Sequence, residues 1–155
     1  MSFVIQGLDP APFAGLFGAG EDALAQAGVI RMEVDKTPGY PCRITLEDAE
    51  PGERVLLLNW EHLPVATPYR ARHAIFVREG ARKAARFVDA VPPVLATRLL
   101  SVRSFGEDGM MRDAEVVDGA ALAPLIHRLL KDPACGWIDV HNARQGCFAA
   151  RVRRA

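Results

Sequence analysis

The end of the chain alternates between apolar and polar positions on both sides of a short loop. Residues 137–141 and 148–152 place apolar side chains at every second position, which is the period of a strand with one buried face. Between them, Asn142 suits the first position of a type I turn, and Gly146 can take the positive φ that returns the chain to a ladder. The pattern therefore predicts a C-terminal β-hairpin.

The length of the hairpin loop decides which side chains share a face. A loop of Ala143–Gly146 pairs Asn142 with Cys147 on one face and His141 with Phe148 on the other. A loop one residue shorter or longer would put His141 and Cys147 on the same face. The chemistry open to the hairpin depends on this register.

A second apolar segment predicts the central strand of the sheet. Val55–Leu58 is apolar at every position, as expected of a strand that is buried on both faces. It runs into Asn59–His62 and a proline-containing loop, Leu63–Arg70, before another strand at His73–Val77. Because polar groups that leave a central strand for a stiff loop are often binding residues, this loop is a candidate part of a site.

The remaining patterns predict shorter elements on both sides of this strand. Period-two alternation predicts two further strands and a second hairpin, at Phe3–Ile5, at Val29–Val34, and at Leu99–Arg103 with Ala114–Val117. Helical spacing of small and apolar residues predicts three helices, at Glu21–Ala27, at Ala81–Val91, and between Gly119 and Asp132 with an apolar stripe of Leu122, Leu125, Ile126 and Leu129.

The order of these elements favours an α+β fold. Strands and helices lack the regular alternation that a doubly wound sheet needs, so we expect a largely antiparallel sheet with the C-terminal hairpin and a few short helices packed on it. The 155 residues suffice for a single globular domain over residues 1–155. The apolar positions of the best-defined elements predict one common core, formed by Leu56, Leu58, Ile75, Val77, Ile126, Leu129, Val140 and Phe148.

Composition and the cysteines favour a cytoplasmic protein. Cys42, Cys135 and Cys147 are odd in number and far apart, so they form neither a disulfide framework nor a close zinc-binding pair. No apolar run approaches the ~20 residues of a membrane span, and the first residues lack the basic segment of a secretion signal. We therefore expect a reducing compartment and no membrane.

The charge balance narrows the class of partner. The formal net charge is zero, so no global field draws the protein to nucleic acid or to an acidic membrane. A near-neutral surface favours weak homodimerisation, most simply with two-fold symmetry. The 19 basic residues include only three lysines, Lys36, Lys83 and Lys131. Arginine binds carboxylates and phosphates through a planar fork, although an arginine-rich composition is also typical of a GC-rich genome.

Several arginines sit where they can bind a small anion. Arg43, Arg70 and Arg144 lie on predicted loops or strand ends, and the Tyr69 hydroxyl adds a donor. His62, His141 and Asn142 complete the set of candidate ligand-binding residues, provided that the loop carrying His62 and Arg70 folds back onto the hairpin turn. The structural alternative is that each arginine instead pairs with an acidic residue, drawn from Glu53, Glu61 and Asp139.

The same residues allow two further kinds of chemistry. Cys42 or Cys147 with an imidazole, and Asn142 to orient it, would resemble a thiol nucleophile, but no local signature supports this and a free cysteine is most often a core residue. A metal site would need His62, His73, His141 and Asp139, whose spacing matches no metal-binding motif. The sequence therefore predicts no metal site and points to no particular cofactor.

Three short motifs resemble a known family. Pro41-Cys42-Arg43, Thr67-Pro68-Tyr69-Arg70 and the closing His141-Asn142-Ala143-Arg144-Gln145-Gly146-Cys147 are similar to those of the bacterial domain-of-unknown-function family DUF1203. The closing motif is the most specific of the three. The resemblance implies a bacterial, soluble, single-domain protein and assigns no catalytic residue.

Three functional hypotheses follow from the sequence. The first is a small cytoplasmic protein that binds a small anionic molecule between the loop after the central strand and the C-terminal hairpin. The second is an enzyme with a Cys/His site, and the third is a homo-oligomeric, partner-binding module without a pocket. A concave site that holds Arg43, Arg70 and His141 would separate the first two hypotheses from the third.

Overall fold

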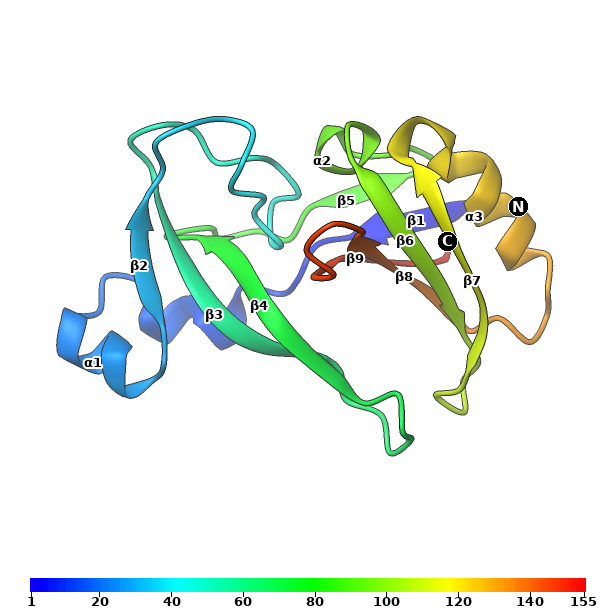
Figure 1. The fold of residues 1–155 in the computed structure, drawn as a ribbon, viewed down its shortest axis with the longest axis horizontal. Coiled ribbons are helices and arrows are strands. Elements are labelled where there is room, and N and C mark those ends of the chain that lie inside the picture. Colours follow the sequence, from blue (N-terminus) through cyan, green and yellow to red (C-terminus); the bar gives the residue numbers. More distant parts are fainter.

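The fold consists of two antiparallel sheets joined by short segments, with a few short helices. The computed structural model describes residues 1–155. Figure 1 shows the two sheets side by side. Their strands are β1 (Phe3–Gln6), β2 (Ile30–Glu33), β3 (Arg54–Leu63), β4 (Ala71–Arg78), β5 (Arg86–Val88), β6 (Leu99–Phe105), β7 (Met111–Asp118), β8 (Trp137–Asn142) and β9 (Phe148–Arg154). The helices are α1 (Glu21–Gln26), α2 (Pro93–Ala96) and α3 (Leu122–Leu130), with short 3-10 helices at Ala11–Leu16 and Gly119–Ala121. This confirms the predicted α+β class.

The larger sheet contains the predicted hairpin at its centre. Its six strands follow the order β5-β1-β9-β8-β6-β7. His141 pairs with Phe148, and the Asn142 amide donates to the Cys147 carbonyl at 2.9 Å, as the loop length predicted. Asn142 and Cys147 therefore share one face of the hairpin, while His141 and Phe148 share the other.

The predicted central strand is central to the smaller sheet only. That sheet has the order β2-β3-β4, so β3 is hydrogen-bonded on both sides. Within it, Val55, Leu56 and Leu58 are buried, whereas Leu57 is half-buried. The prediction of a strand buried on both faces thus holds for three of these four positions.

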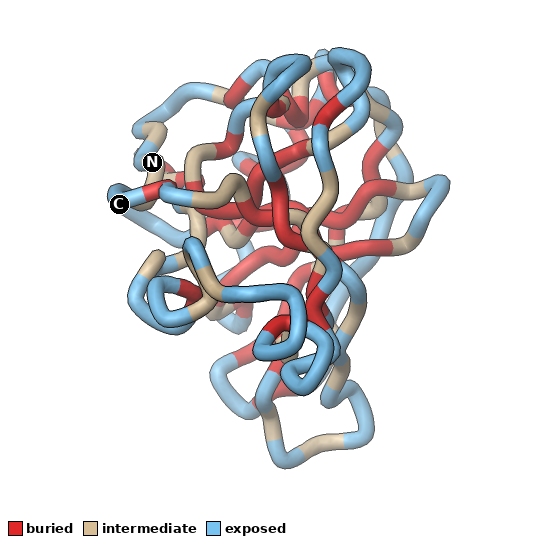
Figure 2. Tube along the Cα trace, turned by 90° about the vertical axis from the view of Figure 1, so that its left-hand side faces the viewer, coloured by how far each residue is buried: buried red, intermediate tan, exposed pale blue.

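The molecule has two main cores where the sequence predicted one. Leu56, Leu58, Ile75 and Val77 pack with Phe13 and other residues on the smaller sheet. Ile126, Leu129 and Val140 instead belong to a core between α3 and the larger sheet. All eight residues predicted to be in the core are buried, and Figure 2 shows buried stretches running through the interior. The prediction of one common core was wrong because β3 pairs with β2 and β4 in a separate sheet and not with the hairpin.

One predicted helix is a strand in the structure. The Ala81–Val91 segment contains no helix and includes β5 at Arg86–Val88, which pairs with β1 through partners such as Ile5 and Phe87. The apolar residues of this segment do not share one buried face, as they would in a helix. Ala85 and Phe87 pack against the larger core, Ala81 belongs to the core of the smaller sheet, and Val88 is exposed. Pairing with an open sheet edge outweighs such a weak local pattern.

The segment that follows Tyr40 connects the two sheets. Cys42 forms an isolated bridge with Phe76 of β4, and the Arg43 amide donates to the Phe76 carbonyl at 3.1 Å. On the other side, the Leu8 amide donates to the Arg43 carbonyl at 2.8 Å. Arg43 is therefore held between the sheets by its own backbone.

None of the helices combines the length and the apolar character that crossing a membrane would require. The longest, α3, has nine residues and packs its apolar stripe on the larger sheet.

Candidate functional site

Arg43 is the most unusual charged residue in the structure, because it is buried without an acidic partner. Only 2% of its surface is exposed. Its Nε donates to the Phe148 carbonyl at 2.8 Å, Nη1 donates to the Pro41 carbonyl at 2.7 Å, and Nη2 donates to Cys147 Sγ at 3.0 Å. Burial lowers the pKa of the guanidinium, and no carboxylate offsets this cost. Each terminal nitrogen keeps one further N–H for another acceptor.

The thiol of Cys147 lies between Arg43 and Asn142. Asn142 Nδ2 donates to the sulfur at 3.4 Å, so two donors converge on it. Asn142 Oδ1 is buried and has no hydrogen-bond partner. An unpaired buried acceptor costs about 1–3 kcal/mol, which is tolerated where a ligand can supply the missing donor.

These residues line two adjoining pockets of about 300 and 430 Å³, which we name the arginine groove. The pockets share Gly39, Arg98, Asn142 and Gln145. Arg43 lines the smaller pocket and Arg144 the larger, and no Asp or Glu lines either one. The groove therefore collects guanidinium groups from three separate segments of the chain.

The three arginines differ in how they are held. Arg98 is paired with Asp48 at 2.7 Å, which fixes its position and partly offsets its positive charge. Arg144 is exposed in the hairpin turn and makes no ion pair. The smaller pocket also has an apolar wall that includes Leu57 and Phe76. The groove can therefore take a small molecule with both an anionic and an apolar part.

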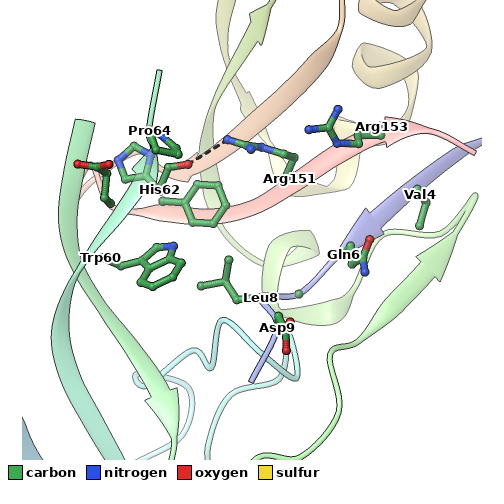
Figure 3. Close-up of a pocket in the computed structure, with 12 residues that line it drawn as sticks. Val4, Gln6, Leu8, Asp9, Trp60, His62, Pro64, Arg151 and Arg153 are labelled. Atoms are coloured by element: carbon green, nitrogen blue, oxygen red, sulfur yellow. Dashed lines mark hydrogen bonds between the residues drawn. The ribbon is translucent and has the colours of Figure 1, made fainter. Parts of the chain in front are cut away.

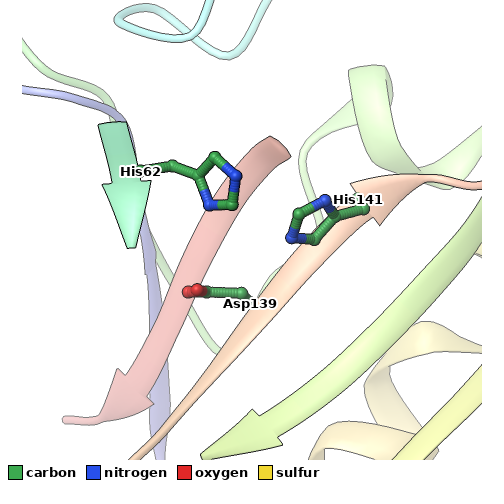
Figure 4. A group of neighbouring side chains, drawn as sticks. All are labelled: His62, Asp139 and His141. Atoms are coloured by element: carbon green, nitrogen blue, oxygen red, sulfur yellow. The ribbon is translucent and has the colours of Figure 1, made fainter. Parts of the chain in front are cut away.

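Two histidines and an aspartate meet on the opposite face of the hairpin. Asp139 and His141 lie two residues apart on β8 and point to the same side, and His62 reaches them from β3 (Figure 4). One ligand atom from each residue lies within 4.8 Å of the others. All three residues are buried. Their carboxylate and imidazole groups are ligands that Zn²⁺ and Fe²⁺ accept.

Burial keeps both imidazoles neutral. It lowers the pKa of His62, and it lowers the pKa of His141 from 6.5 to about 3, although a hydrogen bond to Gly146 opposes the second shift. His141 Nδ1 lies 3.0 Å from the Gly146 carbonyl, to which it can only donate, so Nε2 carries the lone pair of the neutral ring. His62 Nδ1 is buried and has no partner.

Acid will destabilise the protein through His141. Below pH 6.5 His141 binds a proton in the unfolded chain, whereas in the folded protein it binds one only near pH 3. The free energy of unfolding therefore falls as the pH is lowered across this window. The slope from this one histidine is about 1.4 kcal/mol per pH unit, and His62 acts in the same direction. Urea unfolding from pH 7 to 4, with EDTA present, measures this slope of the free energy of unfolding against pH. His141→Gln should flatten the dependence, and an unchanged slope in that variant would contradict the assignment; the exposed His127→Gln is the control.

A third pocket, of about 280 Å³, opens beside His62 (Figure 3). Trp60 and Phe148 line it together with Arg151 and Arg153. Arg151 donates to both oxygens of Asp139, at 2.7 and 2.9 Å, and to the His62 carbonyl at 3.0 Å. Arg151 is therefore a structural residue of β9 that connects it to β8 and β3.

The structure brings together only part of the predicted site. Arg43, Asn142, Arg144 and Cys147 line the arginine groove, whereas His62 and His141 meet on the other face of the hairpin. The predicted Cys/His pair is thus not formed by His141 and Cys147.

Three other predicted residues lie outside both clusters. Arg70 is exposed and pairs with Glu61 at 3.1 Å, as the structural alternative proposed. Tyr69 is exposed beside Phe105. The loop that carries them is tied to the β6–β7 turn by Thr67, which donates to the Gly109 carbonyl, and not to the hairpin turn. Cys42 Sγ accepts from the backbone of Arg78 at 3.2 Å and is a core residue.

The comparisons with known proteins agree with the motifs. The model of a family described as a protein of unknown function, DUF1203, matches residues 39–154. The chain belongs to this family. The matched range contains both clusters and all but Pro38 of the arginine groove. Neither the curated proteins nor the solved structures contain a match to the chain.

Proposed function

We propose that this member of DUF1203 binds a small anionic molecule in the arginine groove. The observation that carries the proposal is the convergence of Arg43, Arg98 and Arg144 on two joined pockets with no acidic side chain among their lining residues. Arginine forks suit carboxylate and phosphate groups, since two parallel N–H bonds match two oxygens.

The buried guanidinium of Arg43 supplies the deepest contact. It donates to Cys147 Sγ and has no counter-charge, so an anion that reaches its free N–H groups compensates for part of the hydration that burial removes. Leu57 and Phe76 line the same pocket and favour a ligand with a short apolar part. A small carboxylate or phosphate ester with a few carbon atoms fits this combination.

The cysteines support a reducing compartment as the place of action. All three are unpaired and buried. Persistent free thiols are typical of the cytoplasm, where disulfides are rare. We therefore propose a cytoplasmic ligand-binding protein.

Thermal-shift measurements with a panel of carboxylates and phosphates test the binding. A ligand that binds only the folded state stabilises it by about 2.7 kcal/mol at a hundred times its dissociation constant, so a true ligand raises the melting temperature with concentration. In Arg144→Ala, the same rise in melting temperature should require about tenfold more ligand or more. The reason is that the exposed Arg144 guanidinium lines the groove and has no structural partner.

Arg70→Ala is the matched control. It removes an exposed arginine of the Leu63–Arg70 loop that pairs with Glu61 outside the groove. The two variants should have the same melting temperature without ligand. Equal loss of the ligand shift in both would show a non-specific charge effect, and the absence of any shift across the panel in the parent would contradict the proposal.

A further inference from the structure

The cluster of His62, Asp139 and His141 has the features of a metal site. Two imidazoles and a carboxylate come together in a buried place, with ligand atoms within 4.8 Å of one another. Aromatic packing explains part of the arrangement, since the His62 ring stacks on Phe148 with centroids 5.2 Å apart and meets His141 edge-on. Packing leaves one feature unexplained, namely that His62 Nδ1 is buried without any hydrogen-bond partner. A bound cation would satisfy this lone pair.

His141 is already oriented as a ligand. Its Nδ1 donates to the Gly146 carbonyl, which leaves the Nε2 lone pair directed toward His62 and Asp139 (Figure 4). Histidines that bind metals commonly donate their other ring nitrogen to a carbonyl or carboxylate in this way, because the bond fixes both the tautomer and the ring orientation. The hairpin turn thus supplies the supporting contact.

Arg151 holds the carboxylate of Asp139 with two hydrogen bonds. Its Nε and Nη2 each donate to one oxygen, at 2.7 and 2.9 Å. A carboxylate has about four lone-pair sites, so each oxygen keeps one for a second partner. Arg151 therefore fixes the direction of Asp139 as a supporting group and competes only partly with a cation for its charge.

We propose that His62, Asp139 and His141 bind a divalent first-row transition-metal ion. Two imidazoles and one carboxylate are a donor set that suits Zn²⁺ or Fe²⁺, whereas Mg²⁺ and Ca²⁺ prefer oxygen ligands. With metal–nitrogen distances of about 2.0–2.1 Å, tetrahedral ligand atoms lie about 3.3 Å apart. Binding therefore draws the three side chains together by up to about 1.5 Å, which small rotations of the rings can provide.

The site also has an entrance and open coordination positions. His62 lines the pocket of about 280 Å³ shown in Figure 3, so an ion and its water molecules can reach the cluster from that side. Because the cluster supplies only three ligands, one or two positions of a four- or five-coordinate ion stay open for water. The site lies on the opposite face of the hairpin from the arginine groove and does not depend on anion binding there.

Metal titrations of the EDTA-treated and dialysed protein test the proposal. Calorimetry should show one equivalent of Zn²⁺ bound. The absorption spectrum of the Co²⁺ form should lack a thiolate charge-transfer band. Under anaerobic conditions, Fe²⁺ should compete with Co²⁺ if iron is preferred. Mg²⁺ should not compete. Loss of a supporting group costs about 10–100-fold in affinity, so His62→Gln and His141→Gln should each weaken Zn²⁺ binding by at least about a hundredfold. His127→Gln, on the exposed face of α3, should bind as the parent does.

A measurement on the parent protein covers the case in which a variant fails to fold. Long-range proton–nitrogen spectra of histidine-labelled protein should show Zn²⁺ shifting the ring nitrogens of His62 and His141 while those of His127 stay unchanged. Failure to bind Zn²⁺, Co²⁺ and Fe²⁺ at micromolar concentration would overturn the proposal. So would metal binding that persists in both glutamine variants, or that shifts neither of the two rings.

Discussion

Replacing Gly7 with alanine will destabilise the protein by about 3 kcal/mol or more, a severe case of overpacking. A Cβ atom at this position would lie 2.0 Å from the Ile44 carbonyl oxygen, which is backbone and cannot rotate away. The Gly7 amide donates to the Ala85 carbonyl, and the next amide donates to Arg43. The substitution therefore separates β1 from the segment that joins the two sheets.

Urea unfolding of Gly7→Ala beside Gly15→Ala measures this effect. A Cβ atom at Gly15 meets nothing within 4 Å, and its backbone is not in the left-handed region, so this variant controls for the intrinsic cost of alanine. Equal stability of the two variants would mean that β1 does not approach Ile44 as closely as described.

Truncating Leu129 to alanine will cost roughly 2–5 kcal/mol. The side chain is buried in the larger core between α3 and the six-stranded sheet, so the truncation adds the cost of a cavity to the lost burial. Leu57→Ala is the contrast, because Leu57 is half-buried and lines the arginine groove. It should cost only about 1 kcal/mol, since water can occupy the space that it leaves.

The two substitutions distinguish the observed architecture from the one that the sequence suggested. If Leu57 lay in a strand buried on both faces, the two truncations would cost about the same. A loss in Leu57→Ala as large as that in Leu129→Ala, measured by urea unfolding, would argue that Leu57 is fully buried, as the sequence suggested, and does not line an open groove.

Local patterns predicted the elements whose signals are complete within a few residues. The period of the closing hairpin and the length of its loop correctly placed Asn142 with Cys147 and His141 with Phe148. The apolar stripe that begins at Leu122 correctly predicted α3. In these segments propensity, turn chemistry and burial all favour the same structure.

Such local patterns could not predict contacts between segments that are distant in sequence. The separation into two sheets depends on β3 pairing with β2, and β5 depends on an edge that β1 offers far away in sequence. The same limit applies to the site. In the sequence Arg98 resembles any surface arginine, and only the fold places it beside Asn142. The strand-like alternation of Asp139, Arg151 and their neighbours was the only signal for the pairing of these two residues across the hairpin.

The location of a bound anion tests the proposed function most directly. Amide proton–nitrogen spectra of the parent should be recorded while the best anion of the thermal-shift panel is added. The account predicts saturable shifts at the amides of Gly39, Asn142 and Gln145, which line both halves of the arginine groove, and small shifts in the Thr67–Arg70 segment. Shifts centred on Thr67–Arg70, with the groove unchanged, would contradict it.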